Sequence, residues 1–285
     1  VKSGDKVSTG DVIAQLSDAS SVQAEATNQP DKTYDLAVIG AGPGGYTAAF
    51  RAADLGLRVA LIDKNNVLGG VCLNVGCIPS KAFLHAAKVI DDSKEASLAG
   101  IDFKSPVISL EKMKNWKNSV VDGLSKGLKG LAQQRKVECF QGQAEFKSDQ
   151  TIEISLENDR QEIQFSNAII AVGSEPASLD FLPDDPRVID STGALEPKEI
   201  PKTILIIGGG IIGLEMATIY SALGSKVTII ELLDQLMPGT DKDLVKPLEQ
   251  QLEKKCEAIY KSSKVIAAEA NENGISVVLE IDDQQ

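Results

Sequence analysis

The sequence predicts an α/β protein with two βαβ units in tandem, preceded by part of an all-β hairpin domain. The main observation is an internal repeat, because residues 36–63 and 204–231 align without a gap and share nine of 28 residues. Each copy has a continuous apolar run, a glycine-rich turn and then apolar residues at helical spacing, which is the pattern of strand, turn and helix. A repeat of this kind predicts two Rossmann-like units in one chain.

Composition agrees with this fold class and excludes some functions. Of the 285 residues, 42% are hydrophobic, only 4% are aromatic and 24 are glycines, which suits a fold with many tight βα turns. The net charge of −12 argues against nucleic-acid binding, which depends on neutralised phosphates. The one candidate membrane run, Thr203–Leu214, is too short to span a bilayer. We therefore interpret it as a buried strand and turn.

Four segments divide the chain. Residues 1–17 have two short apolar runs around Gly-Asp turns, which predicts a β-hairpin. Residues 18–33 lack apolar periodicity and predict a flexible linker. The first βαβ unit lies in residues 34–180 and the second in residues 181–285. Because the first residue is Val, we expect the chain to begin inside a larger protein, and no targeting signal can be assigned.

Apolar spacing also predicts the individual elements. Helices are expected over 46–55, 81–98, 110–135 and 241–255. Strands are expected at 36–40 and 57–62, within 137–165, near 260 and over 275–281. The segment 167–176, NAIIAVGSEP, is expected to be a buried strand that ends in a tight turn.

The first glycine-rich turn, GAGPGG at residues 40–45, follows the pattern G-x-G-x-x-G. Gly40 permits the tight turn, Gly42 lets backbone approach a pyrophosphate, and Gly45 lets the helix pack on the strand. Free N–H groups at the helix N-terminus attract the phosphates. Asp63 ends the next strand, where a carboxylate can accept both ribose hydroxyls. The context predicts a dinucleotide site rather than a plain turn.

The second glycine-rich turn, GGGIIG at residues 208–213, has Glu231 in the same register. A carboxylate that binds the 2′-hydroxyl of the ribose repels a 2′-phosphate. No Arg closely follows Glu231. This half is therefore predicted to prefer NAD over NADP.

A cysteine pair lies between the two turns, in GGVCLNVGCIPSK at residues 69–81. Cys72 and Cys77 are close enough to bridge if the first turn of a helix lies between them. Pro79 and the helical run after it place Cys77 near a helix N-terminus, where the dipole stabilises a thiolate, and Lys81 adds positive charge. The pair therefore predicts thiol–disulfide exchange.

Two other interpretations of the pair are open. A structural disulfide is disfavoured because we expect a cytoplasmic protein. A zinc site could recruit His85, but the spacing is not C-x₂-C and no fourth ligand is evident, so no metal is predicted. We expect His85, on an apolar helix, to pack rather than to act as a base. Cys139 and Cys256 are expected to be buried thiols.

The cysteine segment resembles the active-site segment of dihydrolipoamide dehydrogenases, a branch of the pyridine nucleotide-disulfide oxidoreductase family. Glutathione and mercuric reductases share the two cysteines, but typically have Val at the position of Leu73 and often at that of Ile78. The order of FAD fingerprint, cysteine pair, AVGSEP turn and NAD fingerprint extends the resemblance from about Tyr34 to the end of the chain.

The resemblance implies that the first unit binds FAD and the second binds NAD. It implies that Cys72 exchanges with a dithiol substrate, while Cys77 lies against the flavin. Lys81 would lie near flavin N5 and pair with Glu215, and Val265 would border the NAD adenine. The residues implied to bind the two cofactors are Gly40, Gly42, Pro43, Gly44, Gly45, Asp63, Lys64, Gly69, Gly70, Val71, Cys72, Lys81, Ala144, Val172, Gly173, Ser174, Gly208, Gly209, Gly210, Ile211, Ile212, Gly213, Glu215, Glu231 and Val265.

The chain also departs from the family pattern. The family usually has Glu at Asp63 and Thr at Val172. The hairpin at 1–17 resembles the second half of a lipoyl domain, with Lys6 as an ordinary turn residue. A C-terminal dimerisation domain is absent from this sequence, so the resemblance implies a catalytic base beyond residue 285 and a homodimer through that domain.

The activity implied is oxidation of protein-bound dihydrolipoamide to lipoamide with NAD⁺, with the lipoyl domains of a 2-oxo acid dehydrogenase acyltransferase as partners. The 285-residue segment by itself is expected to be inactive. One alternative is a mercuric or glutathione-type reductase, against which Glu231 and the lipoyl-like hairpin argue. The other alternative is a non-catalytic nucleotide-binding or interaction fragment.

Overall fold

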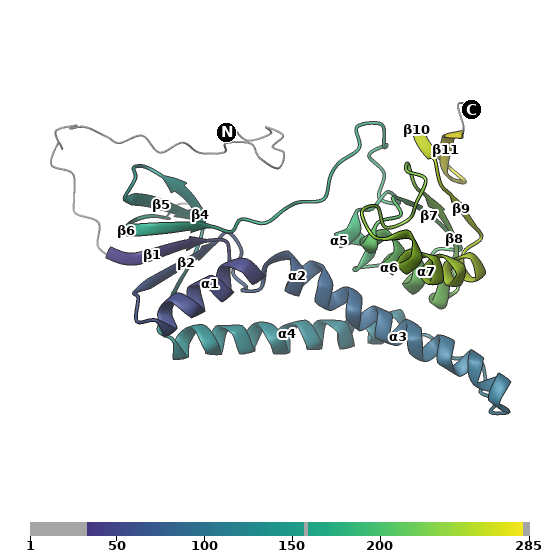
Figure 1. Cartoon of the computed structure of the whole chain (residues 1–285), viewed down its shortest axis with the longest axis horizontal. Coiled ribbons are helices and arrows are strands. Elements are labelled where there is room, and N and C mark those ends of the chain that lie inside the picture. Colours follow the sequence, from purple (N-terminus) through teal and green to yellow (C-terminus); the bar gives the residue numbers. More distant parts are fainter. Residues whose placement is uncertain (1–32, 157–158, 282–285) are drawn as a thin grey trace.

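The computed structural model describes residues 33–156 and 159–281. Figure 1 shows two sheets set apart along the long axis of the molecule, joined by two long helices, α3 (Cys77–Glu95) and α4 (Leu110–Gln134). The predicted α/β class is confirmed. The hairpin predicted at 1–17 and nearly all of the linker at 18–33 lie outside the described residues.

The first sheet has the strand order β3-β2-β1-β6-β5-β4. Strands β1, β2, β3 and β6 are parallel, and β4, β5 and β6 form an antiparallel meander. A run of apolar residues buried on both faces is typical of a central parallel strand, and β1 has such a run. The strands are β1 (Thr33–Ile39), β2 (Val59–Asp63), β3 (Glu138–Gln141), β4 (Gln143–Phe146), β5 (Thr151–Leu156) and β6 (Asp159–Ile170).

Both faces of β1 and β2 are covered. One face packs on helix α1 (Pro43–Asp54) and the C-terminal part of α4, in a core that includes Phe50 and Ala132. The other face packs on β5 and β6, where Ile152 and Ile163 are fully buried. The first glycine-rich turn therefore follows the carboxyl end of β1, in a sheet whose two faces are both packed.

The second sheet is a parallel one with the order β7-β8-β9, and an antiparallel hairpin of two strands follows it. Helix α6 connects β7 to β8, as the repeat predicts. The hairpin strand at 263–271 was not predicted. The elements are α5 (Ser191–Ala194), β7 (Thr203–Ile207), α6 (Ile211–Leu223), β8 (Lys226–Ile230), α7 (Lys242–Lys255), β9 (Ala258–Tyr260), β10 (Ser263–Asn271) and β11 (Gly274–Ile281).

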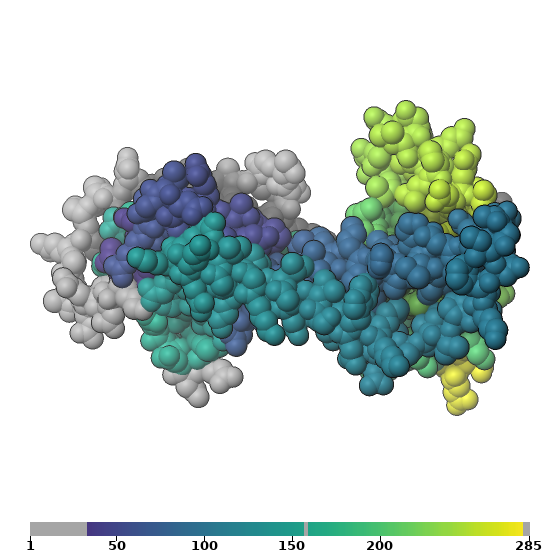
Figure 2. All heavy atoms as spheres, turned by 90° about the horizontal axis from the view of Figure 1, so that it is seen from below, coloured from purple at the N-terminus to yellow at the C-terminus, as the bar shows by residue number. Residues whose placement is uncertain are grey.

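The core of the second unit is not formed by the second repeat alone. Phe83 and Ile90 of α3 are buried in it beside Tyr220 and Ala217 of α6. Helix α3 begins next to α2 (Gly70–Val75) in the first unit and ends, with the 3₁₀ turn η1 (Ala96–Ala99), below the second. Seen from below in Figure 2, the blue and teal helices α3 and α4 connect the two units. Both helices therefore belong to both units.

Two predictions about buried strands were wrong. The strand expected to be buried within 167–176 ends at Ile170, and Ile169 and Ile170 are exposed because β5 pairs only with the earlier part of β6. Strand β7, also expected to be buried, exposes Leu205 and Ile207 on one face, whereas Ile204 and Ile206 on its other face are partly buried against the core of the second unit. No helix among the described residues is long and apolar enough to cross a bilayer.

Candidate active site

The first glycine-rich turn lies against the segment that follows β6. Gly40 has φ of +99°, and a Cβ there would lie 2.2 Å from the carbonyl oxygen of Ala171. The backbone N–H of Ala171 donates to Ile39 O at 2.7 Å. Glycine at position 40 therefore allows β1 to turn while the chain after β6 lies directly beside it, which places Val172, Gly173 and Ser174 next to the turn.

The N-terminus of helix α1 is open. Gly42 is the N-cap residue without a side-chain cap, and Pro43 is the first helical residue. A Cβ at Gly44 would meet nothing within 4 Å, and one at Gly42 would meet only Gly70 Cα at 3.9 Å. Helix N-termini of this kind offer unpaired N–H groups and positive potential to an anion. These residues fit the pyrophosphate of a dinucleotide.

Asp63 braces this turn. Its Oδ2 accepts a hydrogen bond from the Ala41 backbone N–H at 2.7 Å, and its Oδ1 accepts two from Asn65, at 2.8 and 3.1 Å. A carboxylate offers about four acceptor positions, so about one remains for a ribose hydroxyl. Asp63 was predicted to accept both hydroxyls, and the part played by Asn65 was missed, although an Asn two residues after an Asp at a strand end is a turn signal.

The cysteine segment packs on the same turn. The N–H of Gly69 donates to Ala41 O at 2.8 Å, and a Cβ at Gly70 would lie 2.6 Å from Gly42 Cα. This close glycine–glycine contact places helix α2, which carries Cys72, directly beside the phosphate-binding turn. Val71, which lies next to Cys72, is half exposed.

Cys72 and Cys77 are neighbours in space as free thiols, and Cys77 is the first residue of α3. Burial raises the pKa of the Cys72 thiol above its ordinary value, and its hydrogen bond with the Cys77 side chain raises it further. A backbone hydrogen bond from Cys77 and the charge of Lys81 act in the opposite direction. The thiols of Cys72 and Cys77 are therefore close enough for one to affect the protonation of the other, as expected of a redox pair.

Lys81, one helical turn after Cys77, connects the two units. Its ammonium group forms an ion pair with Glu215 of α6, whose side chain is only 13% exposed. The predicted pairing of these two residues is confirmed. A second ion pair, from Lys64 to Glu175 at 3.3 Å, connects the end of β2 to the chain after β6.

The second glycine-rich turn repeats the geometry of the first. Gly210 is the uncapped N-cap residue of α6, and a Cβ at Gly208 or Gly210 would meet nothing within 4 Å. Glu231 is 6% exposed; its Oε2 accepts from Gly209 N–H at 2.6 Å and its Oε1 from Leu233 N–H at 2.8 Å. About two acceptor positions remain on Glu231, enough for both hydroxyls of a ribose. The exposed side chains of Ile211 and Ile212 flank this turn.

The loop after β8 supports this turn in a way that the sequence did not reveal. Leu236 is fully buried, and its side chain would lie 2.5 Å from a Cβ at Gly209. The N–H of Met237 donates to Gly209 O at 2.8 Å. A signal was available in the apolar pair Leu236-Met237, which lies between Asp234-Gln235 and Pro238-Gly239.

The other predicted residues have mixed outcomes. Ala144 lies on β4 and is partly buried, whereas the side chain of Val265 on β10 is 5% exposed, so only its backbone can border a ligand.

His85 packs on Trp116, at 6.1 Å between ring centroids, but it is exposed. Cys139 and Cys256, predicted to be buried, are exposed and half-buried, because Cys139 lies on the edge strand β3. Among residues 33–156 and 159–281, no group of His, Cys, Asp or Glu could hold a metal ion.

Comparison with known proteins agrees with this geometry. The family model "Pyridine nucleotide-disulphide oxidoreductase" matches residues 34–285, and the chain belongs to this family. Among its curated relatives is the dihydrolipoyl dehydrogenase of Vibrio cholerae, 50% identical over 246 residues, which cover 86% of this chain and 52% of the relative. The dihydrolipoyl dehydrogenase of Haemophilus influenzae is 50% identical over 248 residues, also covering 86% of this chain and 52% of the relative.

The solved structures give the same family. The HOCl-induced flavoprotein disulfide reductase RclA of Escherichia coli superposes with a TM-score of 0.73 at 30% identity, over 86% of this chain and 53% of that one. The chain thus spans about half the length of the proteins it matches.

Proposed function

We propose that the protein represented by this chain oxidises a protein-bound dihydrolipoyl group with NAD⁺, as a dihydrolipoyl dehydrogenase. The observation that carries the proposal is the position of Cys72 and Cys77. The two thiols are neighbours beside the first phosphate-binding turn, and the ion pair of Lys81 with Glu215 links α3, which begins at Cys77, to α6, which begins at the second turn. The names of the curated relatives support the choice of substrate.

The first half of the reaction takes place on the two cysteines. In their disulfide form, a dihydrolipoyl thiolate attacks the sulfur of Cys72, forms a mixed disulfide and releases Cys77 as a thiolate. The second thiol of the dihydrolipoyl group then attacks the lipoyl sulfur that is bonded to Cys72, and Cys72 is released. The substrate becomes a cyclic disulfide, and its two electrons remain on the cysteine pair.

The first turn would hold FAD and the second NAD⁺, and the flavin, when bound, would supply the two-electron chemistry that connects a dithiol to a nicotinamide. Gly42, Gly44 and the N-terminus of α1 would hold the FAD pyrophosphate, and Asp63 its ribose. Gly208, Gly210 and the N-terminus of α6 would hold the NAD pyrophosphate. Glu231 would accept hydrogen bonds from the NAD ribose and repel a 2′-phosphate, which supports NAD over NADP.

Several further features stay predictions. A homodimer, the lipoyl domain of an acyltransferase as the partner and a cytoplasmic location all come from the resemblance. The division of the chain at residue 180 into FAD and NAD domains is also proposed. It falls in the strandless stretch between β6 and α5, which supports it.

The test is substitution of Cys77 by Ser in the full-length protein, with Cys139→Ser as the matched control. The Cys77 variant should lose dihydrolipoamide-driven NAD⁺ reduction by about a thousandfold or more, because it lacks the sulfur that must leave. The control should keep full activity. Turnover of the Cys77 variant at a rate comparable with the unmodified protein would exclude the scheme. A preference for NADPH over NADH would instead favour a glutathione- or mercuric-type reductase.

A further inference from the structure

One buried charge joins the two units at a distance from the cysteines. Lys117, on α4, is 1% exposed. Its ammonium group donates to Leu195 O at 3.1 Å, forms an ion pair with Glu196 and lies 5.7 Å from the ring centre of Phe83. Leu195 is the C-cap residue of α5, so the lysine binds the carbonyl end of a short helix in the second unit.

A second side chain also binds the C-terminal end of α5. Tyr220, a fully buried residue of α6, donates from its hydroxyl to Ala194 O at 2.8 Å. Helix α6 also carries Glu215, the partner of Lys81. Lys117 is therefore linked through α5 to α6, the helix that also carries the partner of Lys81.

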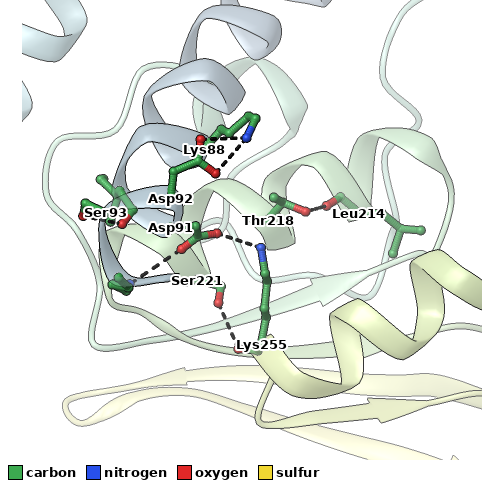
Figure 3. A network of polar contacts seen from close by, with 10 residues as sticks. Lys88, Asp91, Asp92, Ser93, Leu214, Thr218, Ser221 and Lys255 are labelled. Atoms are coloured by element: carbon green, nitrogen blue, oxygen red, sulfur yellow. Dashed lines mark hydrogen bonds and ion pairs between the residues drawn. The ribbon is translucent and has the colours of Figure 1, made fainter. Parts of the chain in front are cut away.

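A second ion pair joins α3 to the far side of the second unit. Asp91 accepts a hydrogen bond from Lys255, the last residue of α7, at 2.7 Å, and the Lys255 carbonyl accepts one from Ser221 of α6 at 2.9 Å (Figure 3). Asp91 is 18% exposed, and Lys94 of the same helix lies 3.7 Å from its other oxygen. At about 1.5 Å per residue, Asp91 lies about 21 Å along α3 from Cys77.

Neither ion pair is an efficient way to add stability. Removing a lysine from water costs free energy that its partners only partly return, and an apolar side chain often does as well in such a place. An ion pair with a buried or partly buried member can instead fix orientation, because it is satisfied only when both partners are correctly placed. Lys117 is the buried member of its pair, and the Asp91 and Lys255 side chains are both partly buried. Lys117 and Asp91 lie on the two helices that extend from the first unit, and their partners lie in the second. Their ion pairs can therefore fix the orientation of the second unit relative to the first.

We infer that Lys117 and Asp91 are positioning residues that set the orientation of the nicotinamide-binding unit relative to the cysteine pair. The inference rests on the proposed function. Lys117 with Glu196 and Asp91 with Lys255 hold the second unit on α4 and α3 respectively. Exchange at Cys72 and Cys77 is local to α2 and α3 and does not depend on them. Transfer of electrons to NAD⁺ depends on Lys117 and Asp91, because it requires the two units to be correctly oriented relative to each other.

The test separates these two steps in the full-length flavoprotein. The variants are Lys117→Met, the milder Glu196→Gln and Asp91→Asn. Asp92→Asn is the matched control, because Asp92 pairs at 2.7 Å with Lys88 of its own helix and joins no two units (Figure 3). Rapid mixing with dihydrolipoamide measures reduction of the bound flavin, and rapid mixing of the reduced protein with NAD⁺ measures its reoxidation.

We expect flavin reduction to stay within about twofold in every variant, and reoxidation by NAD⁺ to slow about tenfold in the three test variants, since each loses a hydrogen bond to a charged group. The double variant Asp91→Asn/Lys255→Gln should be no slower than either single variant, because the two residues act as one unit. The control should match the unmodified protein in both steps.

A readout without NAD checks the structural part. Hydrogen–deuterium exchange of the amides in 191–196 should accelerate about tenfold in Lys117→Met and Glu196→Gln, while the amides of β1 and β2 keep their protection. Unchanged exchange in 191–196 and unchanged reoxidation in folded variants would overturn the inference. Slowing of both half-reactions together would also overturn it, since that is the effect of general destabilisation. If the unmodified protein fails to reduce NAD⁺ with dihydrolipoamide, the proposed function fails instead.

Discussion

Lys81 and Glu215 form an ion pair across 134 positions of sequence, between the helix that begins at Cys77 and the helix that begins at the second glycine-rich turn. Each residue lies one helical turn from the start of its helix, so the pair joins the N-terminal ends of α3 and α6. The lysine is 62% exposed and the glutamate 13%. We therefore expect the pair to matter more for the position of Lys81 than for the stability of the fold.

Substitution of Lys81 by Met tests that view. The lysine end of the pair is largely exposed, so its loss should cost less than the ~3–5 kcal/mol of a fully buried pair, and the thermal midpoint should fall by no more than several degrees. We expect NAD⁺-linked turnover to fall about tenfold or more, because a charge beside the reacting groups is lost. Calorimetry and steady-state kinetics on one preparation measure both quantities. A large loss of stability with normal turnover would show that the pair is merely structural.

Gly40 and Gly44 should differ sharply when replaced by Ala. Gly40 has a positive φ, and its new Cβ would overlap the Ala171 carbonyl, so Gly40→Ala should destabilise folding by about 3 kcal/mol or more. Gly44→Ala meets nothing in the protein and adds a better helix former, so stability should hold or rise by up to about 1 kcal/mol. Urea unfolding measures both changes.

The same pair of variants also distinguishes folding from cofactor binding. Gly44→Ala places a methyl group where a pyrophosphate would approach α1, so FAD affinity should fall while stability does not. Equal FAD affinity in Gly44→Ala and the unmodified protein would show that phosphate does not bind at this turn. Fluorescence titration with FAD provides the measurement.

Glu231→Gln should weaken NAD binding and relax the preference against NADP. The amide keeps the size of the side chain but has only one acceptor oxygen, so it cannot accept from Gly209, Leu233 and two ribose hydroxyls together. We expect the Kd for NADH to rise about tenfold and the ratio of NADPH to NADH activity to increase. The equivalent change Asp63→Asn should leave this ratio unchanged, which makes it the control.

The reduced protein should show a pH dependence that comes from Cys72. Because burial raises the pKa of this thiol, the folded state favours its neutral form. Its contribution to stability is therefore complete below the ordinary thiol pKa and is lost as pH rises through the raised value. Alkylation of Cys72 by iodoacetamide, followed by mass spectrometry, should have a midpoint above that of a free cysteine, about 8.5.

Cys77→Ala supplies the control for this profile. It removes a hydrogen bond and a neighbouring group that both raise the pKa of Cys72, so the midpoint should move down. It should stay above that of a free cysteine, because burial is the larger cause. A midpoint below that of a free cysteine in the unmodified protein would contradict the prediction.

The sequence predicted those parts of the site whose chemistry is local. Spacing within one βαβ unit predicts the glycines at 40–45 and 208–213 and the acids at 63 and 231, and in the structure both turns lie at strand–helix junctions whose backbone N–H groups bind the two acids. The pairing of Lys81 with Glu215 was predicted only because a family resemblance supplied it. Nothing within α3 or α6 alone indicates a partner 134 residues away.

What the sequence could not predict depends on neighbours. A lysine at position 117 reads as a solvent-facing residue of an amphipathic helix, and only the arrival of α5 and Phe83 buries it. Ile169 and Leu205 read as buried because they lie in apolar runs, yet each has too few neighbouring strands or helices to cover it. Hydrophobic periodicity reports what a side chain prefers, not what packs against it.

Strand β7 has a practical consequence for handling the protein. Within the described residues its outer edge is unpaired, and Leu205 and Ile207 are exposed on one of its faces. An open edge of this kind presents backbone donors and acceptors to any other extended chain. A sample of this polypeptide by itself should therefore associate as its concentration rises. A lysine at position 205 or 207 should keep it dispersed without touching either glycine-rich turn.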